Sequence, residues 1–393
     1  MSRQIRNLGE ICDVLNGYAF KSEDYRGLGH RVIRITNVQK GKIVDEDPKF
    51  YDSSQSLEKY ELYNGDLLIS LTGNVGRVGI LNQELLPAYL NQRVGCIRIK
   101  EGAGIVKPYL FHFCNQDAFE TLCIKSSNGV AQKNLSTEWL KTVEIPLPPI
   151  DTQRKIAAIL DKAQELIDLR KAQIEKLDDF LRSVFLDMFG DPVTNPKGWE
   201  VGLIQDLIEK TQYGSSAKAT DAAIGYPMLR MNNITYTGYL DTHELKYVVL
   251  SDSDKQKYLV HNGELLFNRT NSKELVGKTA VFNRIEPFAF AGYLIKMTPN
   301  KSTDPYFIWA YLNSTYGKKI LQTMAKSIVG MANINAEELK RISIMKPPLP
   351  LQQQFAAIVE KTEQQKTLMQ QSLTEMENNF SSLMQRAFRG ELF

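Results

Sequence analysis

The spacing of apolar residues over 150–191 predicts one long helix that packs along another helix. The apolar positions advance by alternating steps of four and three residues, with one polar break at Arg170. A heptad pattern sustained over this length is typical of helices that pair side by side. Pro149 precedes the pattern, and Gly190 and Pro192 end it. The seam consists of Ile156, Leu160, Ala163, Ile167, Ile174, Leu177, Leu181, Val184 and Met188.

A second stretch, 350–393, repeats this pattern at an offset of 199 residues. It also follows a proline cluster, and it ends before Gly390. A single heptad run is also what a buried helix of a globular core shows. Two runs in one register, each after prolines, favour a helix pair. The second seam consists of Phe355, Val359, Thr362, Lys366, Met369, Leu373, Met376, Phe380, Leu383 and Ala387.

The segments that precede the two helices repeat one order of short β-type runs, a helix and a polar loop. In the first domain we expect one such run over 32–38 and the helix from 107 to about 125. The sequence therefore predicts an α+β fold with two repeated α+β domains joined by two long helices. Its parts are a first domain, 1–149, a first helix, 150–191, a second domain, 192–349, and a second helix, 350–393. The matching segments are 33–38 with 229–234, 64–68 with 262–266, 108–109 with 305–306, and 128–134 with 329–335.

Connectivity constrains how such helices can pair. If the second helix packs on the first, it must run back along it, so we expect an antiparallel pair with approximate two-fold symmetry. The 33 residues from 156 to 188 would span roughly 50 Å at about 1.5 Å per residue. That length is about one to one and a half turns of B-DNA. We therefore hypothesise that the helices act as a spacer between two reading domains.

Composition and charge narrow the class of protein. The chain of 393 residues is 43% hydrophobic with a net charge of +3, enough for two or three domains with proper cores. Residues 1–149 carry 18 basic and 17 acidic side chains, and residues 198–349 carry 18 and 14. A domain that holds DNA through phosphates alone is usually more basic. DNA binding would therefore need local patches, or a partner that supplies positive charge.

Cysteine usage and hydropathy indicate a cytoplasmic protein. The four cysteines form no Cys-x-x-Cys pair, which fits a reducing compartment. The N-terminal segment lacks the pattern of a signal peptide, and no apolar run approaches membrane length. We therefore expect no membrane association.

Two loops that follow the paired Asn-Gly-acid-Leu-Leu motifs are the strongest candidates for contact with DNA. They combine short hydrogen-bonding side chains with cations. Arginine and lysine suit guanine, asparagine suits adenine, and hydroxyl groups suit phosphates. An ordinary polar turn beside a strand is the alternative for either loop alone. The candidates are Thr72, Asn74 and Arg77 in the first loop, and Asn268, Arg269, Asn271 and Lys273 in the second.

Other paired segments supply further candidates, each with a structural alternative. The loops 127–134 and 327–335 are polar, and a solvated connection would look the same. The pairing of 18–21 with 213–216 includes Phe20, which we expect in the core. Two arginines at matching strand positions could face DNA or pair with a carboxylate of their own domain. These candidates are Asn128, Gln132, Lys133 and Asn333, then Lys21 and Ser215, then Arg34, Asn37, Arg230 and Asn232.

Motifs for catalysis or metal binding are weak throughout the chain. The Gly-Lys-Thr at 277–279 lacks the first glycine of a P-loop. The tetrapeptide of amino-methyltransferases, Asn/Asp-Pro-Pro-aromatic, does not occur. The four histidines have no metal-ligand spacing, and we expect His112 to be a packed residue. The sequence thus predicts a protein with neither a catalytic residue nor a metal site.

These features together resemble the DNA specificity (S) subunits of type I restriction-modification systems. In that family a Leu-Pro-Pro cluster precedes a helix start with Gln-x-x-Ile-Ala. Here the corresponding segments are 147–157 and 347–356, and the Gly-Asp-Leu-Leu strand and the C-terminal 387–392 are also similar. The likeness covers essentially the whole chain. Thr152 and Gln352 depart from the usual acidic residue at the helix start.

The resemblance implies a subunit without catalysis of its own. Each target recognition domain would read one half of a split double-stranded DNA target from the major-groove side. The helix pair would set the spacer and dock methylase (M) subunits, commonly two, which carry S-adenosylmethionine. Restriction (R) subunits, where the system has them, would add ATP- and Mg-dependent functions, so this chain would need no cofactor.

Two functions from other classes remain open at this point. The first is a coiled-coil scaffold whose paired domains bind protein partners. The second is a stand-alone DNA-modifying enzyme, which the absent motifs disfavour.

Overall fold

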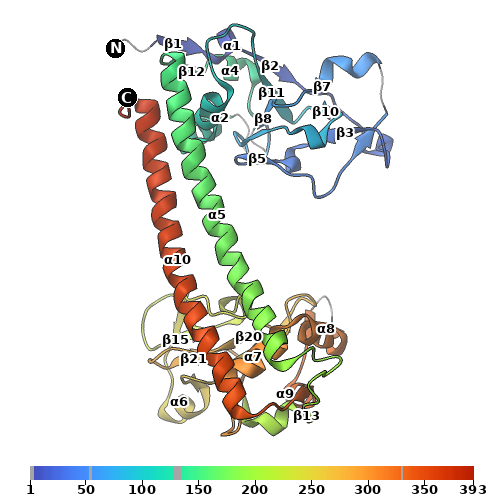
Figure 1. The fold of residues 1–393 in the computed structure, drawn as a ribbon, viewed down its shortest axis with the longest axis vertical. Helices are drawn as coiled ribbons and strands as arrows, with labels where there is room; N and C mark the ends of the chain where they lie inside the picture. The colour runs from blue at the N-terminus through green and yellow to red at the C-terminus, as the bar shows by residue number, and fades with distance from the viewer. Residues whose placement is uncertain (1–3, 53–54, 128–133, 329–330) are drawn as a thin grey trace. The chain divides into compact units, whose positions relative to one another are not determined.

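The computed structural model describes residues 4–52, 55–127, 134–328 and 331–393 (Figure 1). The chain forms two compact units. Unit 1 comprises 1–170 with 372–393, and unit 2 comprises 171–371. Each unit therefore holds one α+β domain together with one part of each long helix.

Unit 1 contains two four-stranded sheets and several short helices. The first sheet has the order β2-β11-β8-β9, and the second has the order β6-β3-β10-β7. The strands of the first are Cys12–Asn16, Val94–Ile99, Leu67–Ser70 and Val78–Ile80, and those of the second are Phe50–Tyr51, His30–Ile33, Ala88–Leu90 and Glu61–Leu62. Two strand pairs are β1 (Gln4–Asn7) with β12 (Glu144–Leu147), and β4 (Val38–Gln39) with β5 (Lys42–Ile43). The helices are α1 (Leu8–Ile11), α2 (Lys107–Asn115), α3 (Asp117–Ser126), α4 (Thr137–Lys141), and the 3-10 turns η1 (Ser22–Asp24), η2 (Ile35–Asn37), η3 (Gln55–Tyr60) and η4 (Gln83–Leu85).

Unit 2 repeats the strand orders of both four-stranded sheets. Its sheets have the orders β14-β22-β18-β20 and β16-β15-β21-β17. The strands of the first are Ile208–Tyr213, Leu294–Pro299, Leu265–Asn268 and Thr279–Val281, and those of the second are Lys246–Val248, Tyr226–Leu229, Phe288–Phe290 and Leu259–Val260. Further strands are β13 (Val201–Leu203) with β25 (Ser343–Met345), and the sheet β19 (Thr270–Asn271), β24 (Met331–Asn333), β23 (Lys326–Ile328). The helices are η5 (Ile204–Leu207), η6 (Met231–Asn233), α6 (Asp252–Tyr258), α7 (Pro305–Asn313), α8 (Thr315–Met324) and α9 (Ala336–Lys340).

The topology confirms the predicted repeat of two α+β domains. In both units the second sheet contains one parallel pair among antiparallel ones, β3 with β10 and β15 with β21. Two predicted elements differ in detail. The helix expected from 107 to about 125 is interrupted at Gln116, whose backbone is extended. The run expected over 32–38 ends as a strand at Ile33, because the side-chain oxygen of Asn37 accepts the backbone N–H of Arg34 at 2.8 Å and closes a turn.

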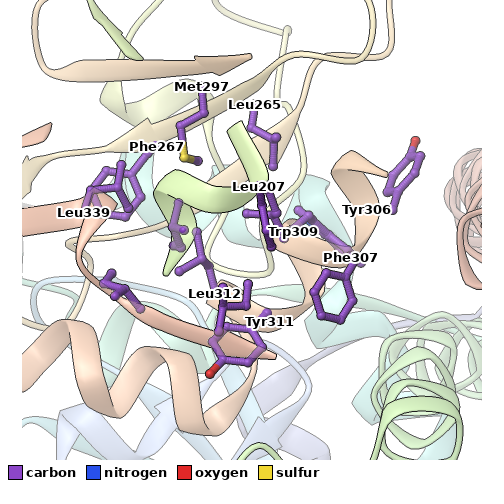
Figure 2. Packing of buried hydrophobic residues seen from close by; sticks show 14 of the residues in the cluster. Leu207, Leu265, Phe267, Met297, Tyr306, Phe307, Trp309, Tyr311, Leu312 and Leu339 are labelled. Carbon is purple, nitrogen blue, oxygen red and sulfur yellow. The ribbon is translucent and has the colours of Figure 1, made fainter. Parts of the chain in front are cut away.

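The core of unit 2 lies between the sheet that contains β18 and β22 and the helix α7, as Figure 2 shows. Phe307 and Leu312 of α7 are fully buried, and the sheet contributes Phe267 and Met297. Burial of each such side chain stabilises the fold by about 1.5–3 kcal/mol. Along β18 and β22 the residues that face this core alternate with residues of a second core cluster, such as Leu266 and Leu294. Burial on both faces thus orients the ends of these strands, which carry the candidate loops.

The long helices are α5 (Ile150–Phe189) and α10 (Leu349–Arg389), and they pack antiparallel within each unit. In unit 1, Leu160 near the start of α5 shares a core with Met384 near the end of α10. In unit 2, Phe185 near the end of α5 lies 5.8 Å, between ring centres, from Phe355 near the start of α10. The start of α5 thus meets the end of α10 in unit 1, and the end of α5 meets the start of α10 in unit 2. The two helices therefore run in opposite directions, which confirms the predicted antiparallel pair.

The seam shifts where the helices meet the domains. The buried positions near the end of α5 are Leu181, Phe185 and Phe189, whereas the sequence pattern predicted Val184 and Met188. The physical reason is that this part of α5 packs against α7 as well as against α10. Phe189 accordingly lies 4.9 Å from the ring centre of Phe307 in α7.

The polar seam residue Lys366 has a charged partner on the opposite helix. Its ammonium donates to both carboxylate oxygens of Asp178 at 2.7 and 2.8 Å. It also lies 4.4 Å above the ring of Tyr239, whose hydroxyl donates to Asp178 at 3.3 Å. A half-buried ion pair of this kind specifies which residues face each other, because removal of one partner leaves the other desolvated and unpaired.

A buried glutamine at the start of each long helix fixes that helix to its domain. The Gln153 carbonyl oxygen accepts the N–H of Val106 at 2.9 Å, and its amide donates to the carbonyls of Gly104 and Pro148. Gln352 makes the same set of contacts in unit 2. The pairing of Thr152 with Gln352 at the two helix starts is therefore wrong by one residue. The structure makes Gln352 the counterpart of Gln153, which agrees with the offset of 199 residues.

Replacement of Gln352 by alanine should destabilise unit 2. The change leaves the buried N–H of Asp304 and the carbonyl of Pro347 without their partners. Each unsatisfied buried group costs about 1–3 kcal/mol, so we expect a loss of about 3 kcal/mol in urea unfolding. The matched control is Gln353→Ala at the next, exposed position, which should leave the midpoint within error. Equal midpoints for both variants would contradict the role of Gln352.

Stability should also depend on the protonation of Glu363 in α10. Burial raises the pKa of this carboxyl to about 7 from its ordinary value of 4.5, while Tyr306 and Asn283 donate to it at 3.4 and 3.2 Å and lower the pKa. The folded state therefore binds the proton more tightly, and stability decreases as pH rises from 4.5 to 7. We expect Glu363→Gln to melt at a higher temperature than the wild type at pH 8, by roughly a few degrees, and to lose this advantage at pH 5. The exposed Glu375→Gln should show no such difference, and an equal shift at both pH values would contradict the prediction.

Candidate nucleic-acid interface

The repeated Asn-Gly-acid-Leu-Leu motif builds the turn and the strand that carry each candidate loop. Gly65 and Gly263 both have φ of +84°, a left-handed conformation that favours glycine. In unit 1 the Asp66 carboxylate accepts the N–H of Tyr63 at 2.8 Å and pairs with Arg98 at 2.6 Å. The motif is therefore structural, and functional side chains must come from the residues that follow it.

In unit 2 the loop after β18 brings Arg269 against an aromatic ring. Its guanidinium carbon lies 4.9 Å from the ring centre of Tyr213 at the end of β14. One terminal nitrogen, Nη2, donates to the side-chain carbonyl of Asn333 at 3.2 Å. The backbone of Thr270 in β19 pairs with that of Asn333 in β24. Arg269, which directly precedes β19, therefore lies near Asn333.

The groups around Arg269 are themselves held in place. The Tyr213 hydroxyl accepts the backbone N–H of Ala336 at 2.9 Å. The Asn333 amide donates to the hydroxyl of Thr270 at 2.9 Å, so both ends of this amide are bonded. Ring, amide and guanidinium therefore form one oriented group, which reduces the entropy lost when a ligand binds.

Two further candidates lie on the same loop. Asn271 is half-buried, and its side-chain oxygen accepts the N–H of Ser272 at 2.9 Å. Lys273 is exposed. The structure thus brings Arg269, Asn271, Lys273 and Asn333 together from the predicted set.

The corresponding loop of unit 1 has a different surface. Thr72 bridges to Asn134, the same backbone arrangement as Thr270 with Asn333. Asn74 is exposed, and the guanidinium of Arg77 donates to the side chain of Gln39 at 2.9 Å. Among the residues that the structure describes in this loop, the aromatic-arginine group of unit 2 has no counterpart, so the two units offer different chemistry at equivalent places.

Several predicted residues lie inside the fold. Asn37 is buried, and its amide donates to the carbonyl of Val44 at 2.8 Å. Asn268 is fully buried and donates to the carbonyl of Met231 at 3.3 Å. Ser215 is buried as well. Contact with a base would require these residues to leave the core, so the structure gives them structural roles.

Arg34 follows the alternative of a carboxylate partner in its own domain, whereas Arg230 bonds to a backbone carbonyl of its own domain. Arg34 donates to the backbone carbonyl of Asp47 at 2.5 Å and lies 3.3 Å from its carboxylate. Arg230 donates to the backbone carbonyl of Glu244 at 3.2 Å. Both arginines therefore serve their own domains. Asn232 is exposed beside the second one.

Lys21, three residues of the loop 127–134 and Phe20 are the remaining predicted residues. Lys21 is exposed at the start of η1. Asn128, Gln132 and Lys133 lie outside the described residues. Phe20 packs in a core cluster with Tyr89, as expected.

Sequence reasoning missed Tyr213, Tyr293 and Arg93. The backbone N–H of Arg269 bonds to the carbonyl of Tyr293 at 3.0 Å, and the N–H of Leu71 bonds to that of Arg93 in the same way. Tyr293 and Arg93 are both exposed. A comparison of the two repeats through the turn that precedes β11 and β22 could have identified Arg93 and Tyr293.

The pairing of Tyr18 with Tyr213 was also wrong, by two residues. A side-chain carbon added at either Gly17 or Gly214 would lie 2.3 or 2.2 Å from the backbone of a neighbouring turn, so these glycines are equivalent. Asn16 therefore takes the place of Tyr213 in unit 1. Its side chain donates to the hydroxyl of Thr137 at 2.9 Å.

Histidine and carboxylate side chains do not gather into a metal site in the described part of the chain. His112 is buried, and its ring nitrogen lies 2.7 Å from the carboxylate of Asp161. Burial lowers the pKa of this histidine, although Asp161 raises it. It is a packed residue, as expected. Among the described residues no helix is both long and apolar enough to cross a membrane.

The fold defines a protein of two repeated α+β domains, each built around parts of two long helices. The family model of the type I restriction modification DNA specificity domain matches residues 3–179 and 196–378. The chain belongs to this family.

Named relatives and solved structures agree with this assignment. The EcoKI specificity subunit of Escherichia coli K12 is 23% identical over 99% of this chain and 89% of its own length. The EcoBI specificity subunit of Escherichia coli is 24% identical, with coverage of 98% and 85%. A structure from a study of type I restriction-modification assembly has a TM-score of 0.60 at 18% identity, with coverage of 99% and 98%. The type I restriction-modification system S subunit from M. genitalium has a TM-score of 0.55 at 12% identity, with coverage of 99% and 96%. Both structures show the shared fold.

Proposed function

We propose that this chain selects the DNA target of a type I restriction-modification complex, and that each domain reads one half of a bipartite sequence. The observation that carries the proposal is the contrast between the two units. Their backbones make the same hydrogen bonds around the candidate loops, whereas the side chains at equivalent positions differ. A protein that reads two different half-sites needs this combination of a shared scaffold and different surfaces.

The exposed or half-exposed members of the predicted set are the proposed contacts with DNA. Arginine, lysine and asparagine can bond to base edges, and hydroxyl groups can bond to phosphates. Buried asparagines and the two internally paired arginines are left out. From the predicted set, the proposed residues are Lys21, Thr72, Asn74 and Arg77 in unit 1, and Asn232, Arg269, Asn271 and Lys273 in unit 2. The exposed residues Arg93, Tyr213 and Tyr293, which were not predicted, are added to them.

The charge balance supports a subunit that works within a complex. Residues 1–149 are nearly neutral, with 18 basic and 17 acidic side chains. Counterion release from phosphates requires several cations, so partner subunits would supply much of the non-specific affinity. We propose methylase subunits, commonly two, as these partners, with restriction subunits in systems that have them.

The long helices are the proposed docking surface for methylase subunits. Helix α5 exposes Leu166 and Leu169 in unit 1, and Phe180 and Leu186 in unit 2. Large apolar side chains on the outer face of a helix indicate a partner that covers them. The chain itself would be non-catalytic and cytoplasmic, and S-adenosylmethionine, ATP and Mg would bind to the partner subunits.

The two domains should be separable as readers of sequence. Replacement of residues 198–349 by the corresponding domain of another family member should change only one half of the methylated motif, because each half-site is read by a different domain. The measurement is a map of N6-methyladenine in DNA from cells with the matching methylase. The reciprocal exchange of 1–149 is the control and should change only the other half. A change in both halves from one exchange would contradict independent domains.

The helices should set the spacer between the half-sites. Four residues added to each helix, within 163–181 of α5 and 362–380 of α10, extend the pair by about 6 Å. Since one base pair rises about 3.4 Å, we expect the spacer to lengthen by about one or two base pairs while both half-sites stay unchanged. The control is an insertion of four residues beside Ile285, an exposed turn residue. Altered half-sites with an unchanged spacer would argue against this role.

A further inference from the structure

We infer that Arg269 determines specificity by reading a guanine in the half-site that unit 2 binds. The inference rests on the proposed function and adds to it a residue, a base and a half-site. It begins with a comparison of the two units at one backbone position.

The fold does not require an arginine at position 269. Its counterpart in unit 1 is Leu71, which is buried. The N–H of Leu71 bonds to Arg93, and its carbonyl accepts the N–H of Leu135, while Arg269 makes the same two backbone bonds to Tyr293 and Ile334. A leucine therefore fulfils the structural task of this position, and the arginine needs another explanation.

The guanidinium of Arg269 is oriented at a cost in solvation. Its Nε is buried and has no hydrogen-bond partner among the described residues. An arginine on a free surface would keep this donor in water, since loss of a hydrogen bond to a charged group is unfavourable. The guanidinium carbon nevertheless lies 4.9 Å from the ring centre of Tyr213, and Nη2 donates to the side-chain oxygen of Asn333 at 3.2 Å.

This geometry favours a base over a phosphate as ligand. A planar guanidinium fixed in orientation presents a fork that matches O6 and N7 of guanine in the major groove. A phosphate would be bound as well by a mobile cation, such as the exposed Lys273 on the same loop. Asn333 acts here as a positioning residue, because its amide is bonded to Arg269 and to Thr270.

The described residues of unit 1 do not form this group at the equivalent place. Unit 1 has Leu71 in place of the arginine and Asn16 in place of the tyrosine. The inference therefore assigns guanine readout to one half-site and to one position within it.

The test is a methylation map made with the full chain and its methylase, for the wild type and for Arg269→Leu. The variant carries the residue that unit 1 has at this place, so we expect it to fold and assemble. Discrimination for guanine at one position of the unit 2 half-site should drop by roughly 10- to 100-fold. The other half-site and the spacer should stay unchanged. Arg284→Leu, which removes an exposed positive charge elsewhere in unit 2, is the matched control and should leave the motif intact.

Arg269→Lys distinguishes a contact with a base from a contact with a phosphate. It keeps the positive charge and loses the fork, so the inference expects relaxed discrimination at the same position. If the leucine variant fails to assemble, Arg269→Lys still tests the inference. Lower methylation at all sites with unchanged base preference would indicate a phosphate contact and overturn the inference.

Other outcomes are equally decisive. An unchanged motif in both variants, or a wild-type half-site for unit 2 without any G·C pair, would overturn the inference and leave the proposed function intact. Absence of methylation at any split motif with the wild-type chain would instead contradict the proposed function itself.

Discussion

The structure depends on the burial of long-helix residues inside the cores of the two domains. In unit 2 the rings of Phe185 and Phe189 from α5 and Phe355 from α10 pack against Phe307 of α7. In unit 1, Ile156 and Met384 join the core beneath α2. Because close-packed side chains resist displacement, each domain is fixed to the helix segments that it surrounds. The strands and loops of that domain are positioned with respect to those segments.

Buried polar contacts add directional constraints to this packing. The glutamine at the start of each helix bonds to the loop before α2 or α7, and Lys366 pairs with Asp178 on the opposite helix. Apolar packing alone tolerates small slips, whereas a buried hydrogen bond is lost when its groups separate. These contacts therefore select one register for each helix. Of these residues, Lys366 occupies a seam position, where a continuous apolar seam would have an apolar side chain.

The repeat separates the scaffold from the surface that varies. Both units keep the same sheet orders, the same glycine conformation before the candidate loop and the same backbone bonds around it. Against this background, differences such as Leu71 and Arg269, or Arg93 and Tyr293, need no structural explanation. Internal comparison thus reveals candidate ligand contacts in a single chain, because one copy shows what the fold alone requires of the other.

The sequence by itself determined the repeat, the α+β class and the antiparallel pairing of the helices. Heptad spacing, prolines and matching motifs are local patterns, and chain connectivity leaves one direction for the second helix. The polar loops after the Asn-Gly-acid-Leu-Leu motifs were also found from sequence, including Arg269. Their choice rested on residue type and on position within the repeat.

Only the tertiary structure decided which of these polar residues face outward. Asn37 and Asn268 carry the same amide as Asn74 and Asn271, yet the first two are buried. Arg34 and Arg230 bond within their own domains, whereas Arg269 lies over Tyr213, which is 56 residues away in the sequence, counted from 213 to 269. A side chain's role depends on partners that non-adjacent strands bring near, and local residue patterns do not encode those partners. For this reason residue patterns did not identify Tyr213, Tyr293 and Arg93 as candidates, although all three are exposed.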